Sequence, residues 1–237
     1  MEGLPSLSKD RLRLMLEDDV GAGDVTSMIV DDRLVEAEII CKESAVIAGL
    51  EEASTLFNLL NCRTESMVGD GSIVEPYTVI MRIHGSARSI LAVERTALNL
   101  LMRMSGIATS TRRYIDIVKG LNPKVKIAAT RKTAPGLMLL DKKAVALGGG
   151  YMHRLGLYDM VLIKDNHLAL VGSVAKAVRT AREMYGNRYR IESVEPKINA
   201  SIDVLWWAEP FMDGNASKAK VFLEDPNLTS TSYHLET

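Results

Sequence analysis

The sequence predicts an α/β protein in which a helix-and-sheet layer precedes a series of parallel strand–helix units. Two observations support this prediction. Strand-like and helix-like patterns alternate from residue 124 onward, which is the order of parallel βα units. Residues 34–91 instead hold mostly strand-like runs, broken by Gly and Pro, around one helical segment. A chain of 237 residues is long enough for one large domain or two small ones.

Hydrophobic spacing defines the elements of the first half. Helical periodicity is found in residues 5–19 and 51–61, while residues 34–47 and 65–91 have the partial alternation of strands. Residues 89–119 then form the longest helical pattern, with an apolar stripe typical of a helix that packs on a core. These elements together predict the helix-and-sheet layer.

The second half alternates strands with helices that end at glycine. Strands are predicted to start at residues 124, 158 and 188, and helices cover 137–150 and 169–186. Each of the first two strands runs directly into polar, cationic residues. Because ligands bind at the C-terminal ends of strands in parallel βα architectures, these ends are where we expect a site.

Positive charge is concentrated in the middle of the chain. Residues 1–87 carry 7 Lys or Arg and 16 Asp or Glu, whereas residues 88–164 carry 14 and 4. The formal net charge of the whole chain is only −1, which argues against general nucleic-acid binding. A basic segment is usually a solvated helix face, but cations at strand ends can converge on an anionic ligand.

No membrane partner or export signal is expected. The longest apolar runs, such as residues 160–163, are far too short to cross a bilayer. The N-terminus has no apolar segment behind a basic head, so a signal peptide is not expected. Cys41 and Cys62 form no C-x-x-C pair, which argues against a disulfide scaffold or a structural zinc site. A cytoplasmic location follows as the expectation.

The candidate site consists of side chains at two strand ends and in the loop between them. The first strand ends in Thr130-Arg131-Lys132, the second reaches Lys164, and the loop contributes His153-Arg154. Parallel strands would bring these groups to one edge, where they suit carboxylates and phosphates. The plainer interpretation is a glycine-rich turn with solvated cations and a structural histidine. His167, which follows the second strand, is expected to order the Lys164 loop.

Several ordered stretches resemble the decarboxylating quinolinate phosphoribosyltransferases, also called nicotinate-nucleotide pyrophosphorylases. The resemblance covers roughly residues 15–192. It is carried by ERTALNLLMRMSGIAT at 94–109, ATRKTAPG at 129–136, GGGYMHR at 148–154 and GLYDMVLIKDNH at 156–167, with support from GAGDVTS at 21–27 and AVIAGL at 45–50. It implies an N-terminal α/β sandwich domain at 1–107. An open, six-stranded α/β barrel domain at 108–237 would follow, incomplete or divergent at its C-terminal part.

The resemblance also implies a reaction and its partners. The family joins quinolinate to phosphoribosyl pyrophosphate, with Mg²⁺ accompanying the co-substrate, and releases pyrophosphate and carbon dioxide to form nicotinate mononucleotide for NAD biosynthesis. Its members work as homodimers or larger homo-oligomers in which a neighbouring subunit completes each site. The implied substrates are therefore two small anions, and no metal ligand is predicted among the side chains.

Residue roles are carried over by position. The resemblance implies that Arg131, Lys132, His153 and Arg154 bind the quinolinate carboxylates, beside Thr130, while Arg95 reaches them from the neighbouring subunit. Lys164 would lie by the ribose and pyrophosphate. The catalytic set would be Lys132 and Lys164 with a carboxylate that stabilises a cationic transition state. On helical position alone, Arg95 would by default be a surface or ion-paired arginine.

The last part of the chain departs from the family pattern. The family has glutamates at alternate positions of the third barrel strand, whereas Glu192 and Glu195 are three residues apart and would point to opposite faces. Either, or neither, would be the catalytic carboxylate. Residues 202–205 are expected to begin a fourth strand, and the following sequence lacks the family's phosphate-binding end, several tens of residues short of a full member.

Three interpretations remain open on the sequence. The chain is a working enzyme with a divergent end, an impaired copy, or a non-catalytic assembly partner that dimerises through the helix at 94–118. A related enzyme class is the sister phosphoribosyltransferase family linked to molybdenum transport, which shares the TRKT-like and GGG-HR patterns. The Lys-Asp-Asn-His sequence at 164–167 favours the quinolinate enzymes.

Overall fold

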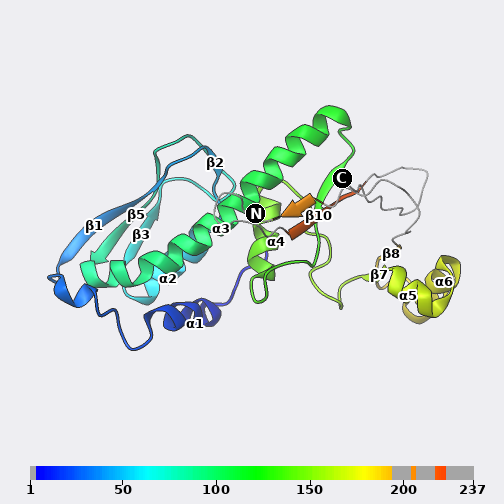
Figure 1. Ribbon diagram of the computed structural model, residues 1–237, viewed down its shortest axis with the longest axis horizontal. Coiled ribbons are helices and arrows are strands. Elements are labelled where there is room, and N and C mark those ends of the chain that lie inside the picture. The colour runs from blue at the N-terminus through cyan, green and yellow to red at the C-terminus, as the bar shows by residue number, and fades with distance from the viewer. Residues whose placement is uncertain (1–3, 194–203, 207–216, 223–237) are drawn as a thin grey trace. The chain divides into compact units, whose positions relative to one another are not determined.

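The computed structural model describes residues 4–193, 204–206 and 217–222, and for the last two ranges only the backbone. The chain divides into two compact units (Figure 1). The first combines Met1–Arg112 with Leu139–Gly148, and the second combines Arg113–Met138 with Gly149–Thr237. The domain limits 1–107 and 108–237 stay a prediction.

The first unit is built on a three-stranded antiparallel sheet. Strands β1 (Leu34–Cys41), β3 (Arg63–Ser66) and β5 (Thr78–Ser86) pair in the order β1-β5-β3. Side chains along β1 alternate between exposed and half-buried, because successive residues of a strand point to opposite faces. A short antiparallel pair joins β2 (Ala45–Val46) to β4 (Ile73–Val74). The strands predicted for this part of the chain are confirmed.

Helices cover this sheet and make the predicted α/β sandwich (Figure 1). The helical elements of the first unit are α1 (Lys9–Val20), the 3-10 turn η1 (Ser27–Ile29), α2 (Leu50–Leu59), part of α3 (Ala87–Leu121) and α4 (Met138–Leu147), and of these α2 and α3 lie over the sheet. Helix α2 packs against α1 and β3. The core between the layers is apolar, and its fully buried members include Leu56, Phe57, Met81, Val93 and Met104.

Helix α3 is the longest element, with 35 residues, and it confirms the helix predicted over 89–119. It continues through Gly106 without interruption. Its residues up to Arg112 belong to the first unit and the rest to the second. Nowhere in the described part of the chain is a helix both long enough and apolar enough to cross a membrane.

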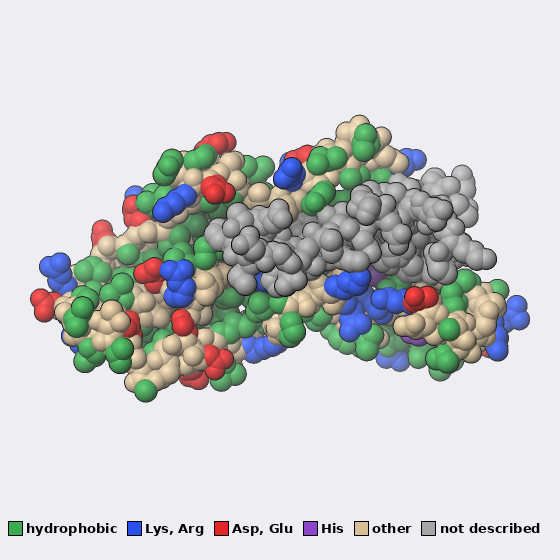
Figure 2. Space-filling view, viewed as in Figure 1, with side chains coloured by type: hydrophobic (Ala, Val, Ile, Leu, Met, Phe, Trp, Pro, Cys, Tyr) green, Lys and Arg blue, Asp and Glu red, His purple; other side chains and the backbone are tan. Residues whose placement is uncertain are grey.

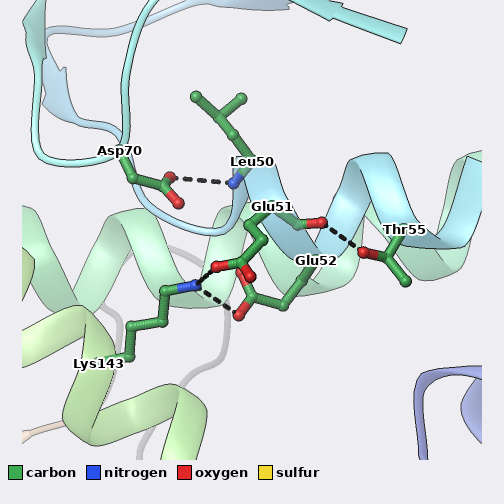
Figure 3. Close-up of polar contacts among 6 residues, drawn as sticks. All are labelled: Leu50, Glu51, Glu52, Thr55, Asp70 and Lys143. Atoms are coloured by element: carbon green, nitrogen blue, oxygen red, sulfur yellow. Dashed lines mark hydrogen bonds and ion pairs between the residues drawn. The ribbon is translucent and has the colours of Figure 1, made fainter. Parts of the chain in front are cut away.

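A buried ion network ties α4 to the start of α2 (Figure 3). The Lys143 ammonium lies 2.8 Å from Glu52 Oε1 and 2.5 Å from Glu51 Oε2. Lys143 and Glu52 are both buried, at 3% and 1% exposure. Burial raises the pKa of Glu52, against the opposing effect of the Lys143 hydrogen bond. The Asp70 carboxylate accepts the Leu50 N–H at 3.0 Å, which caps the first turn of α2.

The glycine run at 148–150 ends α4, as the sequence predicts. The Gly148 N–H donates to the Ala144 carbonyl at 3.0 Å. A Cβ on Gly148 would lie 2.4 Å from the Ala108 carbonyl oxygen and 2.7 Å from Thr111 Cβ, so this approach of α4 to α3 requires glycine. Gly149 has φ +92°, a value that L side chains rarely adopt.

The second unit contains the predicted parallel strands. Strand β7 (Val161–Ile163) runs parallel to β8 (Ile191–Ser193), with Val161 opposite Ile191. Helices α5 (Asp165–Val171) and α6 (Val174–Tyr185) follow β7, and α6 packs against both strands. Their shared core contains Ile163, Ala177, Ala181 and Ile191. This strand–helix–strand unit places the residues after Ile163 at the C-terminal end of a parallel strand.

One predicted helix is wrong, because residues 169–186 form parts of two helices. Helix α5 ends at Gly172, which has φ +97° and donates its N–H to the Leu168 carbonyl. Helix α6 begins after Ser173, whose side chain accepts the Lys176 N–H as an N-cap. Gly172 thus ends α5 and Ser173 begins α6, and both residues are recognisable helix signals in the sequence.

The other strands of the second unit, β6 (Lys126–Ala129), β9 (Val204–Trp206) and β10 (Ser217–Phe222), do not pair as in a closed parallel barrel. Strand β6 pairs antiparallel with β10, which pairs antiparallel with β9. Strand β9 overlaps the expected fourth strand, but a barrel strand would be parallel to its neighbours. A parallel pairing needs a crossover of a dozen or more residues, and ten separate β9 from β10. The α/β class is confirmed, and the barrel is open over the described strands.

Candidate active site

The candidate site lies in the second unit, at the ends of β6 and β7. Thr130 follows β6 directly, and its hydroxyl accepts the Lys132 N–H at 3.0 Å, which closes a tight turn. Arg131 and Lys132 are exposed on this turn. Lys164 follows β7 in the same way, at the C-terminal end of a parallel strand. The predicted positions of these cations at strand ends are confirmed.

Lys164 lies in a positive field. Burial lowers its pKa below the ordinary lysine value, and the charges of Arg154, Lys132 and Arg131 lower it further, while Asp165 has the opposite effect. Lys132 and Arg131 come from the β6 end and Arg154 from the loop before β7, so three segments converge. Figure 2 shows Lys and Arg side chains gathered on one part of the second unit.

Arg154 is the buried member of this cluster. Its exposed fraction is 7%, whereas Arg131, Lys132 and Lys164 are exposed. Burial lowers the pKa of Arg154, and so does the charge of Arg131, while Asp159 and Glu192 raise it. A buried guanidinium is expensive unless carboxylates or an anionic ligand lie close to it. Among the described residues, Asp159 and Glu192 are the carboxylates that favour the charge of this arginine.

His153 and Glu192 form a pair at the edge of the cluster. His153 Nε2 lies 3.1 Å from Glu192 Oε2, and the two side chains are 7% and 4% exposed. His153 has φ +55°, in the left-handed region that non-glycine residues rarely occupy. The second carboxylate oxygen of Glu192 makes no hydrogen bond within the described residues. That oxygen is free to accept a hydrogen bond from a ligand.

Asp159 was not predicted as part of the site. Its Oδ2 accepts the Leu155 N–H at 2.6 Å, and its Oδ1 accepts the Gly156 N–H at 3.3 Å. These amides directly follow Arg154 in the chain. A signal was present in the sequence, because Asp159 is one of only four acidic residues in the basic segment 88–164.

His167 has the ordering role that the sequence indicates. Its Nδ1 accepts the Lys164 N–H at 3.0 Å across the first turn of α5. This bond fixes the backbone at the exit of β7. His167 is exposed, and its contact is with backbone.

Two predicted site residues, Arg95 and Glu195, are not among the described members of this cluster. Arg95 is exposed on α3 in the first unit. Glu195 lies outside the described residues, whereas Glu192 lies beside His153. The assignment of the catalytic carboxylate to Glu192, to Glu195 or to neither stays a prediction. Of the predicted set, the second unit brings together the residues of the β6 turn, the 153–154 loop, Lys164 and Glu192.

Comparison with known proteins identifies the family. The model of the N-terminal domain of quinolinate phosphoribosyl transferase matches residues 24–105, and that of its C-terminal domain matches residues 107–205. The chain belongs to the quinolinate phosphoribosyl transferase family. The match to both family domains, in order, agrees with the resemblance seen in the sequence motifs.

Similar proteins carry names from this family. A probable nicotinate-nucleotide pyrophosphorylase (carboxylating) of Archaeoglobus fulgidus is 45% identical over 160 residues, covering 68% of this chain and 61% of that protein. A protein of the same name from Bacillus subtilis is 43% identical over 178 residues, covering 74% and 61%. The structure of the nicotinate-nucleotide pyrophosphorylase from Francisella tularensis matches with TM-score 0.76 and 32% identity, covering 84% of this chain and 72% of that one.

The chain spans about three fifths of the length of the two curated quinolinate phosphoribosyl transferase relatives it matches. In the described ranges, no group of three or more His, Cys, Asp or Glu side chains could hold a metal ion.

Proposed function

We propose that this protein transfers the phosphoribosyl group of phosphoribosyl pyrophosphate to quinolinate and forms nicotinate mononucleotide. The observation that carries the proposal is the convergence of Arg154, Lys132 and Arg131 on Lys164, whose pKa burial and these charges lower. An anion bound there would relieve the repulsion among them. Membership of the quinolinate phosphoribosyl transferase family and the names of the relatives support the same reaction.

Quinolinate would occupy the part of the cluster nearest Arg154. Its two carboxylates suit the guanidinium groups of Arg131 and Arg154, which form bidentate hydrogen bonds, with Lys132 as a point charge. His153, which lies 3.1 Å from Glu192, would offer a ring N–H to a carboxylate. In this proposal Arg95 is supplied by a neighbouring subunit of a homodimer or larger homo-oligomer, in a cytoplasmic enzyme.

Phosphoribosyl pyrophosphate would lie by Lys164 and the Thr130–Lys132 turn. Mg²⁺ would arrive with this co-substrate and offset the charge of the leaving pyrophosphate. Lys164 and Lys132 would hold phosphate charge of the co-substrate as it reacts.

The chemistry would run in two steps. The quinolinate ring nitrogen attacks the ribose carbon, the bond from that carbon to the pyrophosphate oxygen breaks, and a cation-like transition state forms between them. The Glu192 carboxylate would stabilise that cation, or Glu195 would if it faces the site. The bond to the 2-carboxylate then breaks, carbon dioxide leaves, and the electron pair stays on the ring carbon until a proton is taken up. Fixing the remaining carboxylate and excluding water favour this step.

A turnover assay tests the proposal. Purified protein, quinolinate, phosphoribosyl pyrophosphate and Mg²⁺ are mixed, and nicotinate mononucleotide is followed with time. Product formation is expected. Quinolinate binding without product would contradict the reaction and favour a non-catalytic copy that acts as an assembly partner. Binding of phosphoribosyl pyrophosphate without quinolinate binding would favour the molybdenum-linked sister class.

The variant Arg131→Ala tests the site itself. We expect quinolinate affinity to fall about 100-fold or more, because a charge-assisted bidentate contact is lost. Calorimetric titration with quinolinate measures this. Arg179→Ala, on an exposed position of α6, removes the same charge elsewhere in the second unit and should leave the affinity unchanged. Full affinity in Arg131→Ala would reject the proposed placement of quinolinate.

A further inference from the structure

The loop between His153 and β7 is held by one carboxylate. Residues 154–158 form neither helix nor strand. Within this stretch the Leu155 and Gly156 N–H groups both donate to Asp159, at 2.6 Å and 3.3 Å. Two consecutive amides that converge on one anion fix the backbone at that point. The fixed point begins one residue after Arg154.

An aromatic ring lies against the backbone of this loop. Gly156 is buried, and a Cβ there would lie 2.2 Å from a ring carbon of Tyr158. Tyr158 itself is exposed, so the contact comes from its ring folding back over the loop. The Asp159 carboxylate constrains the neighbouring residue, because the Leu155 N–H that it binds belongs to the peptide group that Arg154 shares with Leu155.

Asp159 also acts on the charge of Arg154. Arg154 is 7% exposed, and burial and Arg131 lower its pKa while Asp159 and Glu192 raise it. Asp159 lies in sequence between Arg154 and β7, whereas Glu192 lies on β8 and pairs with His153. The two carboxylates therefore stabilise the buried guanidinium from different elements, and only Asp159 also holds its backbone.

We propose that Asp159 is a positioning residue, which places the Arg154 guanidinium for recognition of a second carboxylate on the substrate. This inference rests on the proposed function, because it assumes that the site binds a dicarboxylate. It adds that discrimination between a pyridine-2,3-dicarboxylate and a monocarboxylate depends on a residue that touches neither. The clamp acts through two backbone N–H groups and one buried arginine.

Three roles for Asp159 predict different outcomes. A nearby negative charge alone would oppose anion binding, so its removal would strengthen binding of the dicarboxylate. A loop clamp without a role in recognition would lower stability and leave relative affinities unchanged. A positioning residue would weaken binding of the dicarboxylate more than binding of a monocarboxylate, because only the former uses the second cation.

The test measures affinities for quinolinate and for pyridine-3-carboxylate by calorimetry in the full-length wild type, Asp159→Asn and Asp159→Ala. We expect the ratio of the two affinities to fall about tenfold in Asp159→Ala, as when other outer residues that orient a binding group are removed. Asp159→Asn keeps one oxygen that can accept an N–H, so it should give an intermediate ratio and remain folded if the Ala variant does not. Glu183→Gln removes an exposed charge from α6 and should leave the ratio unchanged.

Each result decides the inference. An unchanged ratio in Asp159→Asn and Asp159→Ala, or tighter quinolinate binding, would overturn the role of Asp159 while the proposed function stands. Failure of the wild type to bind quinolinate would overturn both, and is recognised because the unmodified protein itself fails. A lowered ratio, with thermal unfolding of Asp159→Asn close to that of the wild type, would support the inference.

Discussion

The two units of this protein each contain a cluster of charges around at least one buried charged side chain, and the clusters are opposite in kind. In the first unit the Lys143 ammonium contacts two carboxylates, those of Glu51 and Glu52. In the second unit Arg131, Lys132, Arg154 and Lys164 act on one another as like charges. The difference separates a cation that the fold pairs with carboxylates from a group of cations that lower one another's pKa values. Composition alone does not distinguish the two clusters, because the cations of both lie in the basic segment 88–164.

The direction of the lysine pKa values expresses the same contrast. Burial lowers the pKa of Lys143, but its hydrogen bonds to Glu51 and Glu52 outweigh burial and raise the pKa overall. For Lys164, burial and the neighbouring cations act in the same direction and lower the pKa. The charged form of Lys143 is thus favoured by folding, and that of Lys164 is opposed by it.

The largest expected effect comes from breaking the paired cluster of the first unit. Lys143→Ala should lower the free energy of unfolding by about 3 to 5 kcal/mol, because Glu52 would remain buried without its cation. Urea unfolding monitored by circular dichroism measures this. The exposed pair of Arg82 and Glu38 provides the control, and Glu38→Ala should cost less than about 1 kcal/mol. A small loss in Lys143→Ala would contradict the view that α4 depends on this pair.

Removing a cation from the second cluster should have the reverse profile. Lys164→Ala is expected to lower turnover about 100-fold, because in the proposed reaction Lys164 holds charge of the phosphoribosyl co-substrate. Its free energy of unfolding should stay the same or rise, because repulsion by Arg154, Lys132 and Arg131 disappears. Initial rates and urea unfolding on one preparation measure both. A variant that loses stability together with activity would mean that Lys164 is structural.

A smaller effect should be seen as a pH dependence of anion binding. The lowered pKa of Lys164 means that its ammonium loses its proton below the ordinary lysine value of 10.5. An anion favours the charged form, so binding takes up protons and weakens as pH rises through that pKa. Pyrophosphate affinity measured at increasing pH should therefore fall. Lys164→Arg stays charged over this range and should flatten the profile; an identical profile in that variant would exclude Lys164 as the titrating group.

Much of the site follows from sequence, because chemistry-bearing residues stand directly after strands. Thr130, Arg131 and Lys132 follow β6 and Lys164 follows β7, as hydrophobic patterns and family motifs both indicate. The hydrophobic pattern shows where each strand ends. The parallel pairing of β7 with β8 then places Lys164 at the C-terminal edge of that sheet, where ligands bind in such folds.

Features that depend on distant partners were not predicted. Lys143 lies in a Lys-Lys pair that pattern alone assigns to the surface, and only its contact with Glu52, 91 residues away, explains its burial. The antiparallel pairing of β6 with β10 likewise joins segments far apart in the chain. Local sequence patterns do not encode pairings between distant segments. The break between α5 and α6 is different, because Gly172 and Ser173 are local signals that were present in the sequence.

The left-handed backbone at His153 favours a different residue type from the imidazole that pairs with Glu192. With φ +55°, the fold by itself would prefer glycine or asparagine there, and a histidine costs about 1 to 2 kcal/mol. An imidazole kept in that conformation, with Glu192 behind it, is a residue retained against the preference of the chain. Glycine at position 153 would therefore relieve the backbone strain, but the protein would lose the imidazole that pairs with Glu192.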